Sequence, residues 1–339
     1  MGASRPSHGV TSHDVAKVAG VSQATVSRVL REDVHVRPET RARVHAALTA
    51  TGYEPHALAR SFRTRRADAI GVVVARLSYQ LFPAMLEALG QRIAQAGLRM
   101  VVWDAEFGGD LPASKALRQG LVDGVILLAA TRESQFLQDT VSSQAPVVLV
   151  NRMVEGYPCD QIGSDNLGGA SQVAHYFVQA GRRRLALVGG LQRASPIRER
   201  EQGFRDALVA LGHPLSDEHY HRSETFTHAS GVEAARQMLS AAHPPDAIFC
   251  VNDVLATGVM DGARAMGMRI PEDLWVVGYD DIELASWGAY QLTTVHQPML
   301  HMVEQGLALL RAKIAQPDKP LTTIRHPNHL VIRRSSDPV

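Results

Sequence analysis

The chain has few of the features that mark secreted, disulfide-bonded or membrane proteins. Its 339 residues include only two cysteines, Cys159 and Cys250, which are far apart and do not suggest a disulfide framework. Cys250 lies in the apolar run AIFCV and is expected to be a small buried hydrophobic residue. No apolar run reaches the roughly 18 residues of a membrane span, and the N-terminal MGASRPSHGV lacks the apolar core of a secretory signal. The sequence therefore predicts a soluble, cytoplasmic protein with no membrane partner.

Motifs of common enzyme classes are also missing. The chain has no GxGxxG, no P-loop and no GxSxG, and its 15 histidines form no close cluster with cysteines that would hold a metal. We therefore expect no catalytic residues, no metal site and no cofactor. Two alternatives are disfavoured: an enzyme with a doubly wound fold, and a solute-binding module of a transporter, which would need a signal peptide or a lipid anchor.

Charge is distributed unevenly along the chain. Residues 1–66 carry eleven Lys or Arg against five Asp or Glu, whereas the other 273 residues carry 24 against 29. The formal net charge of +1 therefore conceals a basic head on a mildly acidic body. Such a head is the charge distribution expected of contacts with nucleic-acid phosphates.

The segment TSHDVAKVAGVSQATVSRVL, residues 11–30, predicts a helix-turn-helix. Thr11 and Asp14 have the spacing of a capping box, and Gly20 is expected to end the first helix in the left-handed conformation. Ser22 begins a second helix, of the kind that enters the DNA major groove. The alternative is an ordinary helical hairpin in a larger core, which the basic surroundings disfavour.

A third helix is expected at residues 38–50, because Pro38 suits the first helical position and Gly52 ends the helix. Arg37 stands at the cap position, where Ser or Asn is usual. The next segment, residues 55–64, has a helical pattern too short to be stable alone. We therefore divide the chain into a head (1–54), a hinge and linker (55–69) and a body (70–339).

The body alternates short apolar runs with helical segments. Near-continuous apolar strands that alternate with helices indicate parallel sheets covered on both faces. The series is too long for one such sheet and breaks near residues 163–167, so the predicted fold class is an all-α head plus an α/β body of two doubly wound lobes. The final HPNHLVIRRSSDPV is expected to form a last strand and a frayed end. The other strands are expected at 70–75, 98–103, 123–129, 146–150, 184–190, 246–251 and 274–279, and the helices at 81–96, 166–180, 198–211, 229–240 and 253–266.

The stretches DVAKVAGVSQATVSRVL, VRPETRARVHAAL and GYEPHALARSFRT resemble the DNA-binding head and hinge of the lactose-repressor (LacI/GalR) family. Motifs similar to that family recur to the C-terminus: VDGVIL, GSDN, RERxxGF, VNDVLATG, VVGYDDI and LTTVHQP. The resemblance implies lobes of periplasmic-binding-protein type and a double-stranded, pseudopalindromic DNA operator as partner. It also implies a homodimer, favoured over a tetramer because no leucine-heptad tail follows residue 325.

The same resemblance implies which residues contact DNA. Gln23, Ala24 and Arg28 match recognition-helix positions that read base edges, and Arg28 is the best candidate for a bidentate contact to guanine. Phe62 stands where family members insert a leucine into the minor groove; Phe is also a competent wedge, and a core-facing role in paired hinges is the alternative. The other expected DNA contacts are Thr11, Ser22, Thr25 and Ser27 in the head and Ala57 and Arg60 in the hinge.

Ligands of doubly wound sheets bind beyond the carboxyl ends of the strands, which places an effector in the cleft between the lobes. Asn151, Arg152, Asn252 and Asp280 follow predicted strands, and Arg200 lies in RERxxGF early in a helix. By resemblance, Arg200 and Asp280 are the strongest candidates, while an interlobe ion pair is the alternative for Arg152. Three aromatic residues are expected either to face the ligand or to belong to a lobe core or dimer contact: Tyr79, Phe82 and Trp287.

Together these features predict a DNA-binding transcription regulator, most often a repressor in this family. Its operator affinity is expected to be controlled by a sugar or sugar derivative between the lobes. A purine-like ligand and a protein corepressor are the alternatives. Because coupling is a difference in affinity between two states, the sequence does not determine whether the effector releases or strengthens DNA binding.

Overall fold

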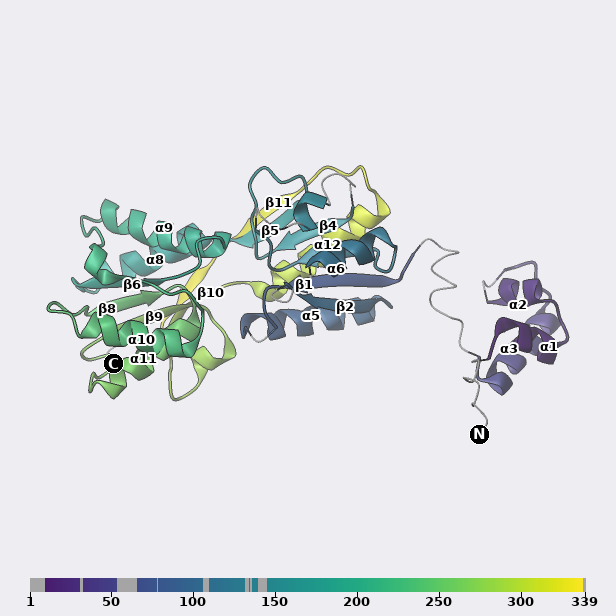
Figure 1. The fold of residues 1–339 in the computed structure, drawn as a ribbon, viewed down its shortest axis with the longest axis horizontal. Coiled ribbons are helices and arrows are strands. Elements are labelled where there is room, and N and C mark those ends of the chain that lie inside the picture. The colour runs from purple at the N-terminus through teal and green to yellow at the C-terminus, as the bar shows by residue number, and fades with distance from the viewer. Residues whose placement is uncertain are drawn as a thin grey trace, which may run out of the picture. The chain divides into compact units, whose positions relative to one another are not determined.

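The computed structural model divides into two compact units, Met1–Ala67 and Asp68–Val339, and each is described by itself (Figure 1). No helix in the described part of the chain is long and apolar enough to cross a membrane. The predicted hinge helix at 55–64, with Ala57, Arg60 and Phe62, lies outside the described residues. The structure describes residues 10–30, 33–53, 66–77, 79–105, 110–131, 134, 136–139 and 145–337.

The N-terminal unit is a three-helix head, formed by α1 (Ser12–Ala19), α2 (Gln23–Val29) and α3 (Pro38–Thr51). The predicted capping box begins α1: the Thr11 N–H donates to Asp14 Oδ2 at 2.8 Å, and Thr11 Oγ1 accepts from the Asp14 N–H at 3.4 Å. Gly20 ends α1 with φ 63°, and Ser22 caps α2 by accepting the Thr25 N–H at 3.2 Å. The turn between the two helices is therefore built as the sequence predicts.

A small core of valines and alanines holds the three helices together. Val15, Val26 and Val44, one from each helix, have no exposed surface. Arg43 of α3 donates to the carbonyl oxygen of Ala19 at 2.6 Å and so ties the third helix to the end of the first. These contacts fix the direction in which the exposed face of α2 points.

The C-terminal unit contains two lobes, each built on a six-stranded sheet. The N-terminal lobe holds β1 (Ala69–Val74), α5 (Leu81–Gln95), β2 (Arg99–Asp104), α6 (Asp110–Arg118), β3 (Gly124–Leu127), β4 (Val147–Val150), β5 (Asp160–Ser164), α12 (Met299–Ala315) and β11 (Thr323–His326). Its strand order is β11-β5-β4-β3-β1-β2, and all of these pairings are parallel. Parallel order places the carboxyl ends of its strands at one edge, which faces the other lobe.

The C-terminal lobe holds α8 (Asn166–Gln179), β6 (Leu185–Gly189), α9 (Ser195–Ala210), η2 (Asp217–His219), β7 (Tyr220–Arg222), α10 (His228–Leu239), β8 (Ala247–Cys250), α11 (Asp253–Ala265), β9 (Trp275–Asp280), η3 (Glu283–Ser286), β10 (Thr293–His296) and β12 (His329–Val331). The strand order is β12-β10-β9-β8-β6-β7, and only β12 runs antiparallel to its neighbour. Figure 1 shows α8 and α9 on one side of this sheet and α10 and α11 on the other.

The chain crosses between the lobes three times, at residues 164–166, 297–298 and 327–328. The crossovers contact one another. Ser164 Oγ donates to Gln297 Oε1 at 2.5 Å, and Asn328 Nδ2 donates to the Asp165 carbonyl oxygen at 3.1 Å. Polar residues close to the crossovers are therefore positioned by both lobes at once.

The predicted fold class of a helical head with two parallel α/β lobes is confirmed. All seven expected strands and five expected body helices are present, with bounds that differ by up to three residues. The last strand is present as β12. The prediction of a frayed end after it is wrong for the residues up to 337, which the structure describes. Ser335 and Ser336 are buried, and the Thr293 N–H donates to Ser335 Oγ at 2.8 Å. The tail after β12 therefore packs on the C-terminal lobe.

Candidate functional site

The exposed face of α2 carries the three residues expected to read base edges. Gln23, Ala24 and Arg28 are exposed, whereas Val26 on the opposite side is buried. Gln23 Nε2 donates to Ser12 Oγ at 2.9 Å, which links α2 to α1. The Arg28 side chain makes no hydrogen bond or ion pair with any residue that the structure describes. Its guanidinium is therefore available to a ligand outside the head.

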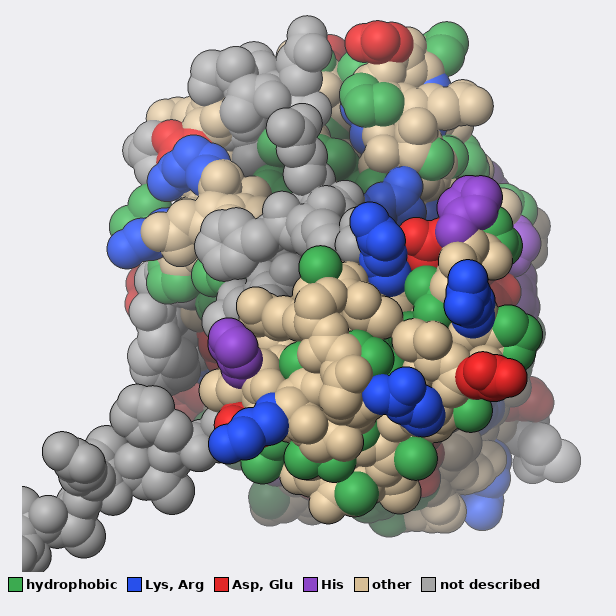
Figure 2. All heavy atoms as spheres, turned by 90° about the vertical axis from the view of Figure 1, so that its right-hand side faces the viewer, with side chains coloured by type: hydrophobic (Ala, Val, Ile, Leu, Met, Phe, Trp, Pro, Cys, Tyr) green, Lys and Arg blue, Asp and Glu red, His purple; other side chains and the backbone are tan. Residues whose placement is uncertain are grey.

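Hydroxyl groups surround this face. The Ser22 and Thr25 hydroxyl oxygens lie 2.9 Å apart at the start of α2, and Thr11 is exposed at the start of α1. Ser27 is partly buried beside them. Figure 2, which looks from the right-hand side of Figure 1, shows Lys and Arg side chains at several places in this view, some of them side by side. The roles of these hydroxyls in phosphate contact remain predictions.

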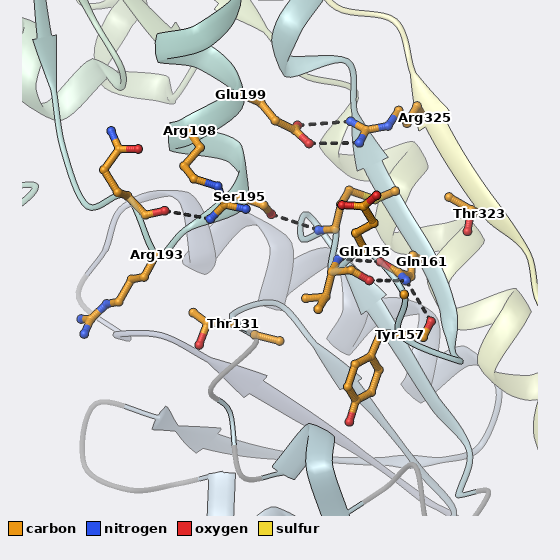
Figure 3. A pocket seen from close by; sticks show the side chains of 15 residues that line it. Thr131, Glu155, Tyr157, Gln161, Arg193, Ser195, Arg198, Glu199, Thr323 and Arg325 are labelled. Carbon is orange, nitrogen blue, oxygen red and sulfur yellow. Dashed lines mark hydrogen bonds and ion pairs between the residues drawn. The ribbon is translucent and has the colours of Figure 1, made fainter.

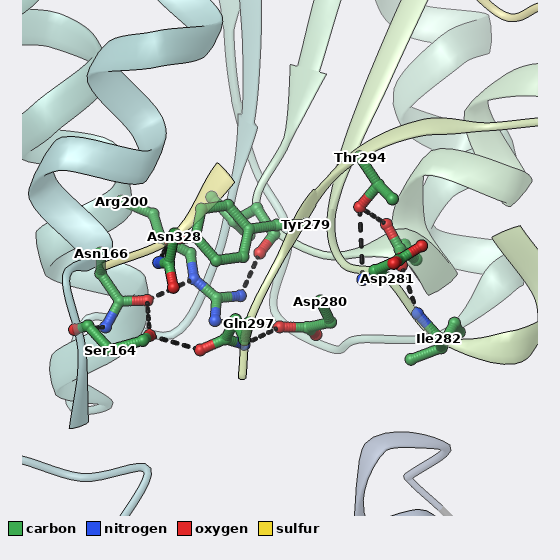
Figure 4. Close-up of polar contacts among 12 residues, drawn as sticks. Ser164, Asn166, Arg200, Tyr279, Asp280, Asp281, Ile282, Thr294, Gln297 and Asn328 are labelled. Carbon is green, nitrogen blue, oxygen red and sulfur yellow. Dashed lines mark hydrogen bonds and ion pairs between the residues drawn. The ribbon is translucent and has the colours of Figure 1, made fainter. Parts of the chain in front are cut away.

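Where the lobes meet, Arg200 of α9 and Asp280 at the end of β9 form a buried ion pair (Figure 4). Arg200 Nη2 lies 2.9 Å from Asp280 Oδ1, and both side chains are almost fully buried. Arg200 Nε donates to Asn166 Oδ1 at 2.9 Å, and its Nη1 donates to the Val251 carbonyl oxygen at 2.7 Å. The guanidinium carbon also lies 3.7 Å from the ring centroid of Tyr279. Contacts on three sides hold this arginine in one position.

Asp280 is also bound from the opposite lobe. The Tyr79 hydroxyl, which belongs to the N-terminal lobe, donates to Asp280 Oδ2 at 3.1 Å, and Gln297 Nε2 donates to Asp280 Oδ1 at 2.6 Å. Burial raises the pKa of Asp280, and the Arg200 charge opposes that rise. Burial and the charge of Asp280 also raise the pKa of the Tyr79 phenol. The tyrosine therefore acts as a neutral hydrogen-bond donor between the lobes.

A second acid lies next to this pair in the C-terminal lobe. Asp253, the first residue of α11, accepts from Thr294 Oγ1 at 2.5 Å and from the Ile282 N–H at 2.9 Å. Burial, and then the negative charge of Asp280, raise the pKa of Asp253 well above its usual range. Asn252 is buried and caps α11, while its Nδ2 has no hydrogen-bond partner in the described part of the chain.

The N-terminal lobe contributes two polar residues directly after β4. Asn151 is buried with φ 61°, and its Oδ1 has no hydrogen-bond partner among the described residues. Arg152 is partly buried, and no hydrogen bond or ion pair joins it to any described residue. Burial lowers the pKa of Arg152 to about 10, with a further contribution from the positive charge of Arg200. Arg152 therefore remains a cation at neutral pH.

The predicted aromatic residues differ in their surroundings. The Phe82 ring meets the Tyr79 ring edge-on with centroids 5.6 Å apart, and Phe82 itself is buried in the core of the N-terminal lobe. Trp287 follows η3 and is 52% exposed. The structure thus brings Tyr79 to the ion pair and Phe82 behind Tyr79. No described contact brings Trp287 to the same place, and its role stays a prediction.

Sequence reasoning missed two residues of this cluster, Gln297 and Phe226. Gln297 binds the ion pair from one crossover, and Asn166, which follows the run QIG in the sequence, binds it from another. Phe226, in the loop between β7 and α10, has its ring centroid 6.2 Å from that of Tyr79. Gln297 follows β10 and would have been found by the strand-end rule had that strand been predicted. Phe226 carries no comparable signal, because it lies in an irregular segment.

A cavity of about 1070 Å³ lies beside the cluster and is lined from both lobes (Figure 3). The first two turns of α9 supply Ser195, whose Oγ accepts the Met153 N–H at 3.1 Å, and Glu199, which pairs with Arg325 of β11 at 3.0 Å. The following residue, Arg200, belongs instead to the buried cluster. Successive residues of α9 therefore face the open cavity and the closed polar centre.

Comparisons with known proteins agree with this architecture. Residues 11–56 match the family model described as bacterial regulatory proteins, lacI family, and residues 174–336 match the periplasmic binding protein-like domain. The HTH-type transcriptional regulator CelR of Thermobifida fusca is 34% identical over 331 residues, which cover 95% of this chain and 96% of that protein.

Solved structures cover nearly the whole chain. The structure named as a transcriptional regulator CelR–cellobiose complex has a TM-score of 0.73 at 30% identity, over 96% of this chain and 99% of that one. The lac repressor dimer bound to operator and the anti-inducer ONPF has a TM-score of 0.84 at 27% identity, over 97% of this chain and 99% of that one.

Proposed function

This chain belongs to the lacI family of DNA-binding transcriptional regulators, and we propose that it is a repressor controlled by a small sugar-like molecule bound between its lobes. The observation that carries the proposal is the hydrogen bond from Tyr79 to Asp280, because it joins the two lobes at the buried pair of Asp280 with Arg200. A ligand that competes for these groups has different affinities for two arrangements of the lobes, which is the condition for coupling to DNA binding.

The sugar class is supported by the donor and acceptor set at the interlobe edge. Carboxylate, amide and guanidinium groups suit the hydroxyls of a sugar, and Tyr79 and Phe226 offer ring faces from opposite lobes. The CelR structure is named as a complex with cellobiose. We therefore place the effector against Arg200, Asp280 and Asn252.

On the DNA side, we place base reading at Gln23, Ala24 and Arg28. A homodimer presents two such heads to the two halves of a pseudopalindromic operator. In the hinge, Phe62 is proposed as the minor-groove wedge. Phe62→Ala is then expected to reduce both DNA bending and operator affinity, measured by the gel mobility of permuted fragments. Unchanged affinity and bending would contradict the role of Phe62 as a wedge.

The experiment begins with selection of an operator from random duplex DNA by repeated rounds of binding. The dissociation constant for the selected duplex is then measured by fluorescence anisotropy in the presence of monosaccharides, disaccharides and purines. We expect a sugar to change the constant for the native chain and for Arg205→Lys, but not for Arg200→Lys. Arg205 is the matched control because it lies on the same helix, over the Tyr220 ring in the C-terminal lobe. A response to purines alone would contradict the sugar class.

A further inference from the structure

The two arginines of the interlobe cluster differ in how their charges are balanced. Arg200 is neutralised by Asp280 and bound on its remaining sides by Asn166, Val251 and the Tyr279 ring. Asp280 in turn accepts from Arg200, Gln297 and Tyr79. Because this pair is satisfied, it needs no further ion.

Arg152 has no such counter-ion. It is the second residue after β4, at the carboxyl end of a parallel strand, and it lies close enough to Arg200 and Asp280 for their charges to act on it. No residue that the structure describes forms a hydrogen bond or ion pair with its guanidinium. A cation withdrawn from water without a partner is costly, so proteins pair such groups or leave them to bind an anion.

The acidic residues of the same region are engaged elsewhere. Glu199 pairs with Arg325 at 3.0 Å, and Asp281 pairs with Arg333 at 2.8 Å. Asp253 accepts from Thr294 Oγ1 at 2.5 Å and from the Ile282 N–H at 2.9 Å within the C-terminal lobe. None of these three carboxyl groups pairs with Arg152, so the positive charge of Arg152 has no counter-ion among the described residues.

Unsatisfied polar groups lie beside that charge. Asn151 Oδ1, next to Arg152 in the chain, and Asn252 Nδ2, next to the carbonyl that binds Arg200, are buried without partners among the described residues. One is an acceptor and the other a donor, which suits hydroxyl groups. Buried polar atoms without partners are uncommon in native proteins and call for an explanation such as a ligand.

We propose that the effector of this protein carries one negative charge, a carboxylate on a sugar-like body, and that Arg152 binds it. The inference rests on the proposed interlobe effector site and specifies its chemical class. A carboxylate balances the single positive charge of Arg152, whereas a phosphate dianion would overcompensate it. A planar guanidinium also matches a carboxylate in bidentate geometry.

The first test needs no ligand. Replacing Arg152 by Met removes the unpaired cation and keeps much of the side-chain volume, so we expect the melting temperature of the ligand-free chain to rise by roughly 2 °C or more. The matched variant Arg200→Met leaves Asp280 without its cation, and its melting temperature is expected to fall. A fall in Arg152→Met as large as that in Arg200→Met would overturn the proposal, because it would show that Arg152 is already paired.

The second test uses chosen probes at constant ionic strength: D-gluconate, D-glucuronate, D-glucose 6-phosphate, D-glucose and cellobiose. A ligand that binds only the folded chain raises its melting temperature. We expect a probe with a carboxylate to raise the melting temperature of the native chain but not that of Arg152→Met. If only the phosphate probe raised the melting temperature, and did so in the native chain but not in Arg152→Met, the effector would be an anion but not a carboxylate. If a neutral sugar raised the melting temperatures of the native chain and of Arg152→Met equally, the negative charge of the effector would be contradicted. The interlobe sugar site would still be supported.

Failure of the proposed function is distinguishable from failure of this inference. If neither charged nor neutral sugars shift the melting temperature, the sugar-like effector is contradicted. The ligand-free comparison of Arg152→Met with Arg200→Met then still decides whether Arg152 carries an unbalanced charge.

Discussion

The phenol oxygen of Tyr79 lies 3.1 Å from Asp280 Oδ2, although 201 positions separate the two residues in the chain. Tyr79 precedes α5 in the N-terminal lobe, and Asp280 ends β9 in the C-terminal lobe, where Arg200 also binds it. The Tyr79 ring contacts Phe82 in its own lobe and Phe226 in the other. One hydroxyl group therefore adds a polar link to an aromatic contact between the lobes.

Tyr79→Phe removes this link and keeps the ring contacts. We expect the free energy of unfolding, measured in urea, to fall by about 1 kcal/mol, the usual net value of a buried hydrogen bond. Amide hydrogen exchange at residues 164–166 should become faster, because the lobes separate more easily. Tyr220→Phe is the control, since its hydroxyl bonds Glu201 within one lobe. If the two variants changed exchange at that crossover equally, Tyr79 would not be an interlobe link.

Arg28→Ala tests base reading by the exposed face of α2. A bidentate contact from arginine to guanine contributes about 1–3 kcal/mol of discrimination, so the preference for the selected operator over random DNA should fall roughly tenfold to a hundredfold. Affinity for random DNA should change little. Arg37→Ala, an exposed arginine at the start of α3, is the control for general loss of positive charge. Anisotropy titrations that showed the same loss on both duplexes would contradict base reading.

The sequence was sufficient for the head and for much of the body. Caps, turn glycines and helical spacing are local signals, and Thr11, Gly20 and Ser22 occupy the predicted positions. The strand-end rule identified Asp280 as a candidate, the family resemblance singled out Arg200 with it, and the structure pairs the two side chains. The sequence could not show that α12 and β11 return to the N-terminal lobe, because strand order and crossovers depend on contacts between distant segments.

The contacts between side chains of the two lobes could not be predicted from the sequence either. Tyr79 was expected near a ligand, but its bond to Asp280 depends on how the two lobes meet. The lack of a partner for Arg152 is likewise a property of the assembled edge, because any of several acids in the sequence could have neutralised it. Local pattern identifies candidate groups, whereas the folded arrangement determines which charges remain unbalanced.

Gly258→Ala tests the close contact between α10 and α11. A Cβ at Gly258 would lie 2.1 Å from the His228 carbonyl oxygen and 2.9 Å from the Gly231 Cα, so the helices would have to move apart. We expect a loss of about 1–3 kcal/mol in the free energy of unfolding, which outweighs the helix propensity gained by Ala. Gly288→Ala is the control, since a Cβ at that position would meet no atom within 4 Å. Equal urea midpoints for the two variants would refute the close packing.

Asp253→Asn tests the buried acid beneath the ion pair. Its folded pKa is raised above the unfolded value of about 4 by burial and by Asp280. A group with a raised folded pKa contributes stability that is present below the unfolded pKa and is lost as pH rises through the folded one. Asn does not titrate, and its amide can still accept from the Ile282 N–H and donate to Thr294 Oγ1.

The stability of Asp253→Asn relative to the native chain is therefore expected to increase as pH rises above about 4, by at most about 1.4 kcal/mol per pH unit. Urea unfolding at a series of pH values measures this difference. Asp318→Asn, in an exposed turn after α12, provides the control, because its carboxylate is hydrated in both the folded and the unfolded chain. If the difference between Asp253→Asn and the native chain instead decreased with rising pH, the carboxylate would be stabilised as an anion in the fold. Asp253 would then be an anion beside Asp280, and its pKa would not be raised in the folded chain.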